Sequence, residues 1–175
     1  MAESRQYDLA RTIKIDLAAH GGKWREPGFK AIAVHRFGNW RMTIEPKILR
    51  APLSFVYRRI EERIRWKYGI ELPYTVTLGN GVQIHHFGGI VINGGVSIGD
   101  NTIIRHGVTI GVRSENDVDD NPIIGANVSL GVGCVILGKV HIGDGAKIGA
   151  NAVVLCDVPP RATAVGVPAR IIPAK

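Results

Sequence analysis

The chain has 175 residues, of which 45% are apolar, and a formal net charge of +7. That apolar content allows a packed core and excludes a disordered chain. No apolar run approaches the roughly 18–20 residues that span a membrane, and the polar first residues lack the apolar segment of a signal peptide. Two cysteines, Cys134 and Cys156, do not make a disulfide framework, so a reducing, cytoplasmic location is expected.

Charge, aromatic residues and glycine divide the chain near residue 71. Residues 1–71 contain 15 basic and 8 acidic residues and nine of the eleven aromatic residues, whereas residues 72–175 contain seven residues of each charge and 17 of the 22 glycines. We therefore expect a helical domain over residues 1–70 and a second domain over residues 71–175. The basic residues are mixed with glutamate and large apolar residues, without a recognition motif, so no nucleic-acid partner is expected.

The spacing of apolar residues predicts three helices in the first domain. Over residues 5–20 apolar residues recur at helical intervals, and two glycines follow. A second helix is predicted over residues 29–40. A third runs over residues 46–68, with a kink or restart at Pro52 and Gly69 as its C-terminal cap. Its later part is amphipathic and basic, which indicates either a solvated cationic face or peripheral contact with an anionic surface or partner.

From residue 72 onward an aliphatic residue recurs at every sixth position, often followed by glycine. An amphipathic helix needs apolar residues three and four apart, and hairpins show strict alternation and turn dipeptides. Short strands separated by tight glycine-rich corners explain the period, so a β-solenoid is predicted. The aliphatic positions are Leu72, Leu78, Ile84, Ile92, Ile98, Ile104, Ile110, Ile124, Leu130, Ile136, Ile142, Ile148 and Val154.

Two steps break this period. Ile84 and Ile92 are eight residues apart, and Ile110 and Ile124 are fourteen apart. The longer step contains the polar, acidic stretch 112–122, which we interpret as an extruded loop that replaces one hexad. Loops that leave a solenoid usually serve a binding face.

The repeat resembles the left-handed parallel β-helix of the hexapeptide acyltransferases, in which three hexads make one coil of a triangular prism. The resemblance implies a mostly β fold with an N-terminal α-helical cap, and a homotrimer. Stacking by three hexads places His86 and His106 on one corner of adjacent coils, and His85 beside Arg105, about 4.8 Å apart. On the same count, one face carries Ile84, Ile104, Ile124 and Ile142.

The order of several motifs is similar to that of the serine acetyltransferases. The matching stretches are residues 28–40 (GFKAIAVHRFGNW), 69–71 (GIE), 84–92 (IHHFGGIVI), 108–111 (VTIG), 158–160 (VPP) and 166–170 (GVPAR). The resemblance implies an acetyl-CoA-dependent O-acetyltransferase that works by direct attack in a ternary complex. It assigns His86 as the general base, a role that a neutral imidazole suits near pH 7. It assigns Glu71 as the carboxylate that orients this base.

Three departures from the family affect the acceptor side. The family's acidic residue and proline have no clear counterpart in the shortened stretch 21–27. His85 stands where the family has Asp, and Asp120 and Asn121 stand where it has Arg and His. The sequence at residues 84–86, taken together with residues 104–111, is more similar to that of the subgroup that acetylates exopolysaccharide or capsule sugars. We therefore expect a sugar acceptor, with serine O-acetylation in cysteine biosynthesis as the alternative.

Other site residues follow from the same resemblance. The expected acceptor-binding residues are His85, Arg105, His106, Asp120 and Asn121. The expected coenzyme A-binding residues are Gly111, Val132, Lys147, Ala150 and Arg170. The C-terminal coils are locally basic, which suits the phosphates of the co-substrate. No metal is expected, and a covalent acetyl-enzyme is disfavoured because Cys134 occupies a small inward position.

Two other classes of protein stay open. A zinc hydratase of the γ-carbonic anhydrase kind shares the β-helix and binds zinc through three histidines. The spacing of His85, His86 and His106 does not meet that pattern. A catalytically inactive scaffold, with basic helices that recruit partners, is the other class. Zinc analysis and an acetyl-CoA turnover assay discriminate between them.

Overall fold

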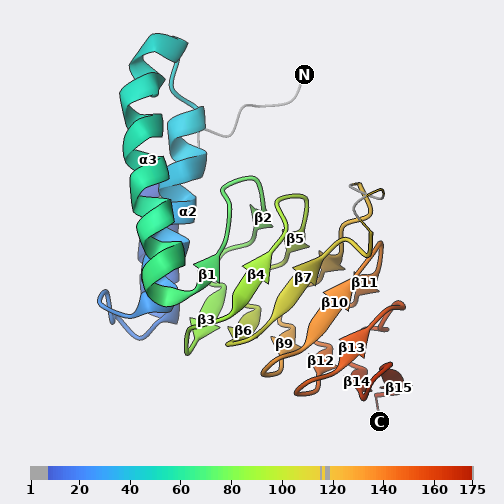
Figure 1. The fold of residues 1–175 in the computed structure, drawn as a ribbon. Helices are drawn as coiled ribbons and strands as arrows, with labels where there is room; N and C mark the ends of the chain where they lie inside the picture. The colour runs from blue at the N-terminus through green and yellow to red at the C-terminus, as the bar shows by residue number, and fades with distance from the viewer. Residues whose placement is uncertain (1–7, 115, 117–118, 175) are drawn as a thin grey trace, which may run out of the picture.

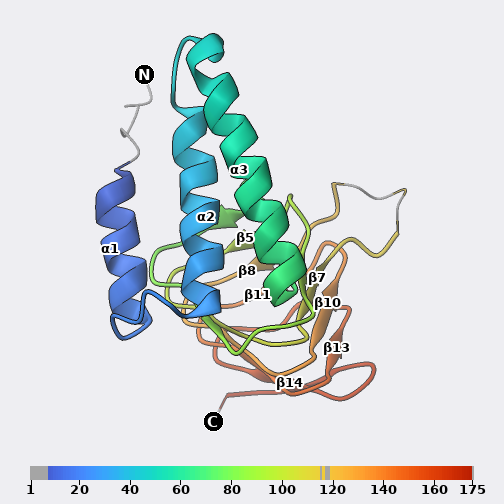
Figure 2. The same cartoon turned by 60° about the vertical axis from the view of Figure 1, so that its left-hand side comes forward.

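The computed structural model describes residues 8–174 except 115, 117 and 118. The described residues form three helices followed by fifteen short strands, and the helices stand at one end of a prism of strands (Figure 1). The helices are α1 (Leu9–Ala19), α2 (Pro27–Met42) and α3 (Lys47–Tyr68). α2 lies between the other two and contacts both (Figure 2).

The observed helices differ from the predicted ones mainly at the start of α2 and at Pro52, and elsewhere by one or two residues at their ends. α2 begins at Pro27, two residues early, because proline suits the first helical turn, where its missing N–H needs no partner. α3 continues through Pro52 as a single helix, so the expected restart is wrong. Packing of α3 against α2 compensates for the one hydrogen bond that this proline removes. Gly69 caps α3 with a left-handed φ of 61°, as predicted, and residues 5–7 of the first predicted helix lie outside the described residues.

The strands form the three faces of the prism. Face A consists of β1 (Ile70–Glu71), β4 (Ile90–Ile92), β7 (Thr109–Gly111), β10 (Val135–Leu137) and β13 (Val153–Val154). Face B consists of β2 (Thr77–Leu78), β5 (Ser97–Ile98), β8 (Ile123–Ile124) and β11 (His141–Ile142). Face C consists of β3 (Gln83–His85), β6 (Ile103–Arg105), β9 (Ser129–Leu130), β12 (Lys147–Ile148) and β14 (Thr163–Val165), with β15 (Arg170–Ile172) antiparallel to β14.

From β1 to β13 successive strands lie on successive faces, and each pairs in parallel with the strand one coil away. The chain therefore winds as a left-handed parallel β-helix of about five coils, which confirms the predicted fold. The aliphatic positions of the six-residue repeat point inward and are buried. Each large aliphatic side chain that is fully buried stabilises the fold by about 1.5–3 kcal/mol.

One predicted column of the core is wrong. Ile84 and Ile104 share face C, but Ile124 and Ile142 lie on face B. The reason is that residues 112–122 leave the prism at the edge between faces A and B and return to the next strand in the winding order. The fourteen-residue step therefore adds a loop at one edge and removes no strand.

The helices are fitted closely to the first coil. A Cβ atom on Gly28 of α2 would overlap the carbonyl group of Ile84, so only glycine allows this approach. α3 ends at Tyr68 and β1 begins at Ile70, while the division into domains at residue 70 stays a prediction. Among the described residues, no helix has both the length and the apolar character needed to cross a membrane.

Candidate functional site

The candidate site lies at the prism edge between faces C and A, called the histidine edge below. Its stacked corners are residues 86–89, 106–107, 132–133 and 150–151. Backbone hydrogen bonds join the corners, as where the Gly107 amide donates to the Gly88 carbonyl at 2.9 Å. The first corner is two residues longer than the others, which explains the eight-residue step in the repeat.

His86 begins this longer corner in an uncommon backbone conformation. Its φ is 62°, in the left-handed region that residues with a Cβ atom seldom adopt. Elsewhere in the described solenoid, the residues with a left-handed φ are glycines, asparagines and Arg161. Unfavourable backbone conformations tend to persist where function requires them. The fold thus presents an exposed imidazole at a position where glycine or asparagine is usual.

His106 lies on the same edge one coil further along, as predicted. The rings of His86 and His106 meet edge to face, with centroids 5.8 Å apart and an interplanar angle of 88°. Nδ1 of His106 is buried and has no hydrogen-bond partner among the described residues. Buried polar atoms normally have a partner, so this nitrogen is an exception in the described part of the chain.

A cleft of about 470 Å³ opens beside His86. It is lined by Ala19, His20, Gly21, Lys23, Glu26, Ile84, His85 and His86. The segment between α1 and α2 therefore forms one wall and the first coil forms the other. His20 joins the two walls, because its Nδ1 donates to the Asp16 carbonyl at 2.8 Å and its Nε2 accepts from the Ile84 amide at 3.3 Å. These partners fix the orientation of the His20 ring.

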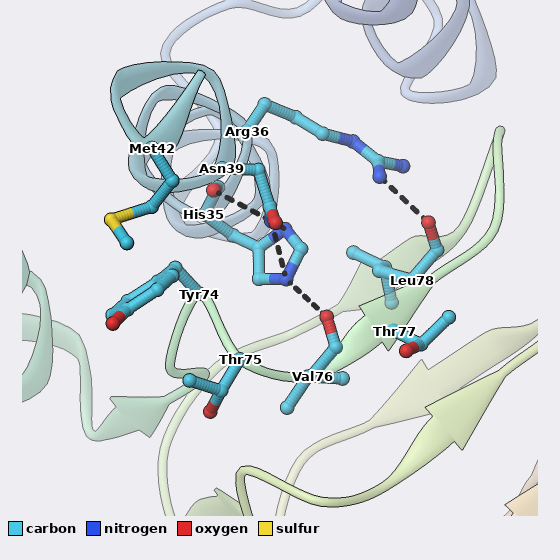
Figure 3. A pocket seen from close by; sticks show the side chains of 9 residues that line it. All are labelled: His35, Arg36, Asn39, Met42, Tyr74, Thr75, Val76, Thr77 and Leu78. Carbon is cyan, nitrogen blue, oxygen red and sulfur yellow. Dashed lines mark hydrogen bonds between the residues drawn. The ribbon is translucent and has the colours of Figure 1, made fainter. Parts of the chain in front are cut away.

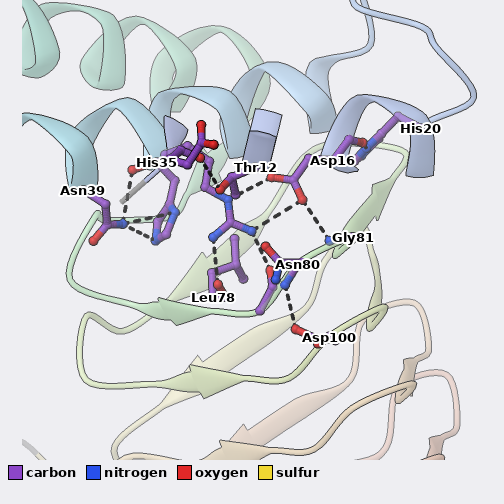
Figure 4. A network of polar contacts seen from close by, with 12 residues as sticks. Thr12, Asp16, His20, His35, Asn39, Leu78, Asn80, Gly81 and Asp100 are labelled. Carbon is purple, nitrogen blue, oxygen red and sulfur yellow. Dashed lines mark hydrogen bonds and ion pairs between the residues drawn. The ribbon is translucent and has the colours of Figure 1, made fainter. Parts of the chain in front are cut away.

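A buried ion pair between Asp16 and Arg36 holds α1 against the first coil. Figure 4 shows Asp16 pointing toward Gly81 of that coil. Arg36 Nε donates to Asp16 Oδ2 at 2.8 Å, and both side chains are buried. Asp16 Oδ1 accepts the Gly81 amide at 2.9 Å, and Arg36 also donates to the Leu78 carbonyl at 2.7 Å. A buried ion pair is tolerated when further hydrogen bonds satisfy both charges, as they do here. Because His20 follows Asp16 by one helical turn, this network fixes the position of the cleft wall.

His85 and Arg105 are neighbours in register on face C, as predicted. Nε2 of His85 donates to Gln83 Oε1 at 2.8 Å. Partial burial lowers the pKa of His85, and the charges of His20 and Arg105 lower it further, while Glu26 opposes the shift. The lowered pKa favours the neutral form of His85, which supplies a hydrogen-bonding group to the cleft.

Glu71 lies on face A in β1 and is half-buried beside Val91. β1 starts at the histidine edge, because the Ile90 amide donates to the Gly69 carbonyl at 3.0 Å. In the described part of the chain, no hydrogen bond or ion pair joins Glu71 to His86. Its role as the carboxylate that orients the base stays a prediction.

Asp120 and Asn121 lie at the other edge of face A, where the extruded loop returns to the prism. The Asn121 side chain packs so closely on Gly95 that a Cβ atom there would overlap it. The strands of face A separate this edge from the histidine edge. One protomer therefore does not bring Asp120 or Asn121 together with His86, and residues 115, 117 and 118 of the loop lie outside the described residues.

The residues expected to bind coenzyme A are divided among three places. Val132 and Ala150 continue the histidine edge beyond His106, and the Asn151 amide donates to the Val132 carbonyl at 2.8 Å. Gly111 ends β7 at the far side of face A. Two cations lie on face C, the exposed Lys147 in β12 and Arg170, which pairs with Val165 at the end of β14. These binding roles stay predictions.

A second cavity, of about 500 Å³, lies between α2 and the segment that follows β1 (Figure 3). His35 lines it, and its Nε2 donates to the Val76 carbonyl at 2.9 Å. Burial lowers the pKa of His35 to about 4 despite this hydrogen bond. A neutral imidazole committed to a backbone carbonyl fastens α2 to the first coil, so we assign His35 to packing.

Four polar residues that line the cleft or hold its wall in place were not predicted from the sequence: Asp16, His20, Lys23 and Glu26. A signal existed for Asp16, which falls on the apolar side of its helix one turn after Ile13. The others lie in or beside a short stretch that carries no motif. Among the described residues, no group of three histidine, cysteine, aspartate or glutamate side chains is arranged to hold a metal ion.

Comparison with known proteins identifies a family and several proteins that the chain is similar to. Residues 121–156 match the family described as bacterial transferase hexapeptide (six repeats). The chain is 35% identical over 170 residues to the serine acetyltransferase of Helicobacter pylori, with 95% of each protein covered. It is 36% identical over 145 residues to that of Salmonella typhimurium, which covers 83% of this chain and 50% of the relative. The chain thus spans about half the length of several curated relatives that it matches.

Solved structures show the same relationship. The serine acetyltransferase of Neisseria gonorrhoeae superposes with a TM-score of 0.79 at 30% identity, over 95% of this chain and 66% of that one. The soybean enzyme superposes with a TM-score of 0.80 at 34% identity, over 94% of this chain and 69% of that one.

The expected sugar acceptor of exopolysaccharide or capsule synthesis is wrong. The relatives above are serine acetyltransferases, so the alternative reading fits better. The error came from taking the departures at His85, Asp120 and Asn121 as a change of acceptor class. With 35% identity over 95% of both chains to the Helicobacter pylori protein, this chain belongs to the serine acetyltransferase family.

Proposed function

We propose that the chain is a serine O-acetyltransferase, which moves the acetyl group of acetyl-CoA to the hydroxyl of L-serine. The observation that carries the proposal is the exposed imidazole of His86, paired with His106 and facing a cleft. The relatives supply the substrates: a structure of the Brucella abortus enzyme contains coenzyme A, and one of the soybean enzyme contains serine.

In the proposed reaction His86 acts as the general base. It takes the proton of the serine hydroxyl while the hydroxyl oxygen attacks the carbonyl carbon of the thioester. The tetrahedral intermediate then loses the thiolate of coenzyme A, which receives the proton back from His86. General base catalysis of this kind contributes roughly 10²–10⁴ to the rate. A backbone N–H at a corner of the histidine edge is the proposed donor to the oxyanion.

Glu71 is the proposed partner of the second ring nitrogen of His86. Support comes from its strand, which starts at the histidine edge one coil before His86. A carboxylate in this place holds the imidazole in one tautomer and stabilises the imidazolium that forms. Replacement of Glu71 by Gln tests the role, since it keeps the shape of the side chain and removes its charge.

The acetyl-CoA arm is proposed to run along the histidine edge past Val132 and Ala150. Lys147 and Arg170 are the proposed partners of its phosphates, because they are exposed cations on the adjoining face C. This path brings the thioester to the imidazoles from the C-terminal coils. The acceptor then enters from the opposite side, through the cleft at the α1–α2 segment.

The test is release of thiol from acetyl-CoA with L-serine, followed by mass-spectrometric identification of O-acetyl-L-serine. Glycine serves as a matched control because it lacks the hydroxyl. Turnover with L-serine and none with glycine supports the proposal. Absence of O-acetyl-L-serine under these conditions contradicts it.

A homotrimer is the proposed assembly. Support comes from large apolar side chains that a single chain leaves exposed, among them Ile48, Phe55 and Trp66 on α3, Val91 on face A and Ile123 on face B. Such exposure is typical of surfaces that pack against another chain. Light scattering after size-exclusion chromatography is expected to give three times the mass of one chain, and a monomer mass contradicts the proposal.

A cytoplasmic location is also proposed. Support comes from Cys134 and Cys156, which are both free thiols, as is usual in a reducing compartment. Cell fractionation tests it, and recovery from the membrane fraction contradicts it.

A further inference from the structure

The corner that carries His86, residues 86–89, has little backbone stiffness of its own. Its second half is Gly88 and Gly89, whose φ values of 110° and 65° lie in the left-handed region. A Cβ atom on Gly88 would meet no described atom within 4 Å, so packing does not restrain the corner at that point. Because glycine leaves the backbone many accessible conformations, a general base on this corner needs a restraint from elsewhere.

Phe87, the residue that follows His86, contacts the helical cap. Its ring meets the Tyr68 ring edge to face, with centroids 5.6 Å apart and an interplanar angle of 76°. Tyr68 is the last residue of α3. Phe87 nevertheless keeps 53% of its surface exposed, so burial alone does not explain its position. Aromatic pairs in this arrangement are more stable than the area they bury predicts, so the contact joins the corner to α3.

Tyr68 is itself held by two lysines. Lys30 Nζ, on α2, donates to the Tyr68 hydroxyl at 3.4 Å and lies 5.8 Å from the centroid of its ring. Lys67 Nζ lies 5.5 Å from the same centroid. An ammonium group within about 6 Å of an aromatic ring is attracted to its face. The ring that receives Phe87 is therefore fixed by contacts from both α2 and α3.

The end of α3 also meets the corner through the backbone. A Cβ atom on Gly69 would lie 3.1 Å from the Gly89 amide nitrogen and 3.2 Å from Gly88 Cα. The Ile90 amide donates to the Gly69 carbonyl at 3.0 Å. The glycine half of the corner thus rests on the cap of α3, and Phe87 fastens the half that carries His86.

We propose that Phe87 and Tyr68 are positioning residues, which lock the corner onto the end of α3 and so hold His86 where it accepts the proton of the acceptor hydroxyl. The inference rests on the proposed function, in which His86 is the base. His106 restricts how the imidazole ring turns, whereas the Phe87–Tyr68 contact restricts the backbone that carries it. A small displacement of a catalytic group lowers the rate without any loss of substrate contacts.

The test uses four variants of the full chain: Phe87→Ala, Tyr68→Leu, the double variant that combines them, and the conservative Phe87→Tyr. The matched control is Phe37→Ala, because Phe37 forms a ring contact with Trp40 at 5.8 Å and both residues lie on α2. Steady-state kinetics gives kcat and KM for L-serine and acetyl-CoA. Hydrogen exchange followed by mass spectrometry reports on residues 86–90 independently of activity.

Phe87→Ala is expected to lower kcat about 3-fold to 10-fold, as the loss of one aromatic pair predicts, while KM for both substrates stays within about twofold. Exchange at residues 86–90 should become faster by a similar factor, because it follows local opening of the corner. Tyr68→Leu should match Phe87→Ala, and the double variant should fall no further than either, since all three remove one contact. Phe87→Tyr should restore wild-type kcat, and Phe37→Ala should change neither kcat nor corner exchange.

Three results overturn the inference: a kcat for Phe87→Ala within twofold of wild type, unchanged exchange at the corner, or a double variant whose loss is the product of the single losses. Each of them leaves wild-type turnover of L-serine intact, so the proposed function survives. Failure of the wild-type chain to acetylate L-serine overturns the proposed function and this inference with it.

Discussion

The rings of His86 and His106 meet edge to face with centroids 5.8 Å apart, although twenty residues separate them in the chain. The contact follows from the solenoid, because one coil brings the chain back to the same edge. It restricts the orientations of the His86 ring, which is otherwise exposed. A base that is held in a reactive orientation loses less entropy when the acceptor binds.

Replacement of His106 by Asn is therefore expected to lower kcat about tenfold, because His86 loses the ring that restricts it. KM for acetyl-CoA is expected to stay constant. Steady-state kinetics over pH 5–9 provides the measurement, with circular dichroism to show that the variant is folded. A kcat and pH profile equal to wild type would show that His106 does not position the base.

Replacement of Asp16 by Asn is expected to destabilise the protein by about 3–5 kcal/mol, because Arg36 would remain buried without its counter-ion. Urea unfolding measures the change. The matched control is Glu62→Gln, which removes the exposed Arg59–Glu62 pair at 3.7 Å and is expected to cost less than about 1 kcal/mol. Similar losses in both variants would contradict the assigned role of Asp16.

Stability is expected to fall in acid because of His35. Burial lowers its pKa from 6.5 to about 4, so between these values the unfolded chain binds more protons than the folded one. The contribution of neutral His35 to the free energy of unfolding is complete above pH 6.5. It is lost as the pH falls toward 4, and the total loss is about 3 kcal/mol. In His35→Gln the free energy of unfolding should depend less on pH in this window. An unchanged slope would show that His35 titrates normally.

The two cysteines are expected to react at very different rates. Burial raises the pKa of Cys134 to about 12, whereas Cys156 is exposed. Titration with Ellman's reagent at pH 8 should show one fast thiol, and the second only after unfolding in guanidinium. Cys156→Ser should remove the fast phase. Two thiols that react at similar rates would contradict burial of Cys134.

The solenoid could be predicted from the sequence because its signal is local and repeated. The six-residue period fixed which residues face inward, and the shared corner of His86 and His106 followed from counting coils. The predicted face of Ile124 was wrong, because counting six-residue repeats cannot distinguish an insertion at one edge from the loss of a strand. The helix over residues 46–68 was predicted, but a restart at Pro52 was wrong, since packing against α2 outweighs a local preference.

The helical wall of the site could not be predicted in the same way. Asp16 and Arg36 are twenty residues apart on different helices, and Gly81 is a further forty-five residues away. Their contact depends on how α1 and α2 pack on the first coil, which no periodic pattern encodes. Lys23 and Glu26 lie in a short connection whose turns become visible only in three dimensions.

The central claim is that His86 acts as the base when this chain acetylates L-serine. The most direct measurement is the rate of O-acetyl-L-serine formation by His86→Asn relative to wild type, at saturating acetyl-CoA and L-serine. The account predicts a kcat lower by roughly 10²–10⁴, with unchanged thermal unfolding. A folded His86→Asn variant that forms O-acetyl-L-serine at the wild-type rate would contradict it.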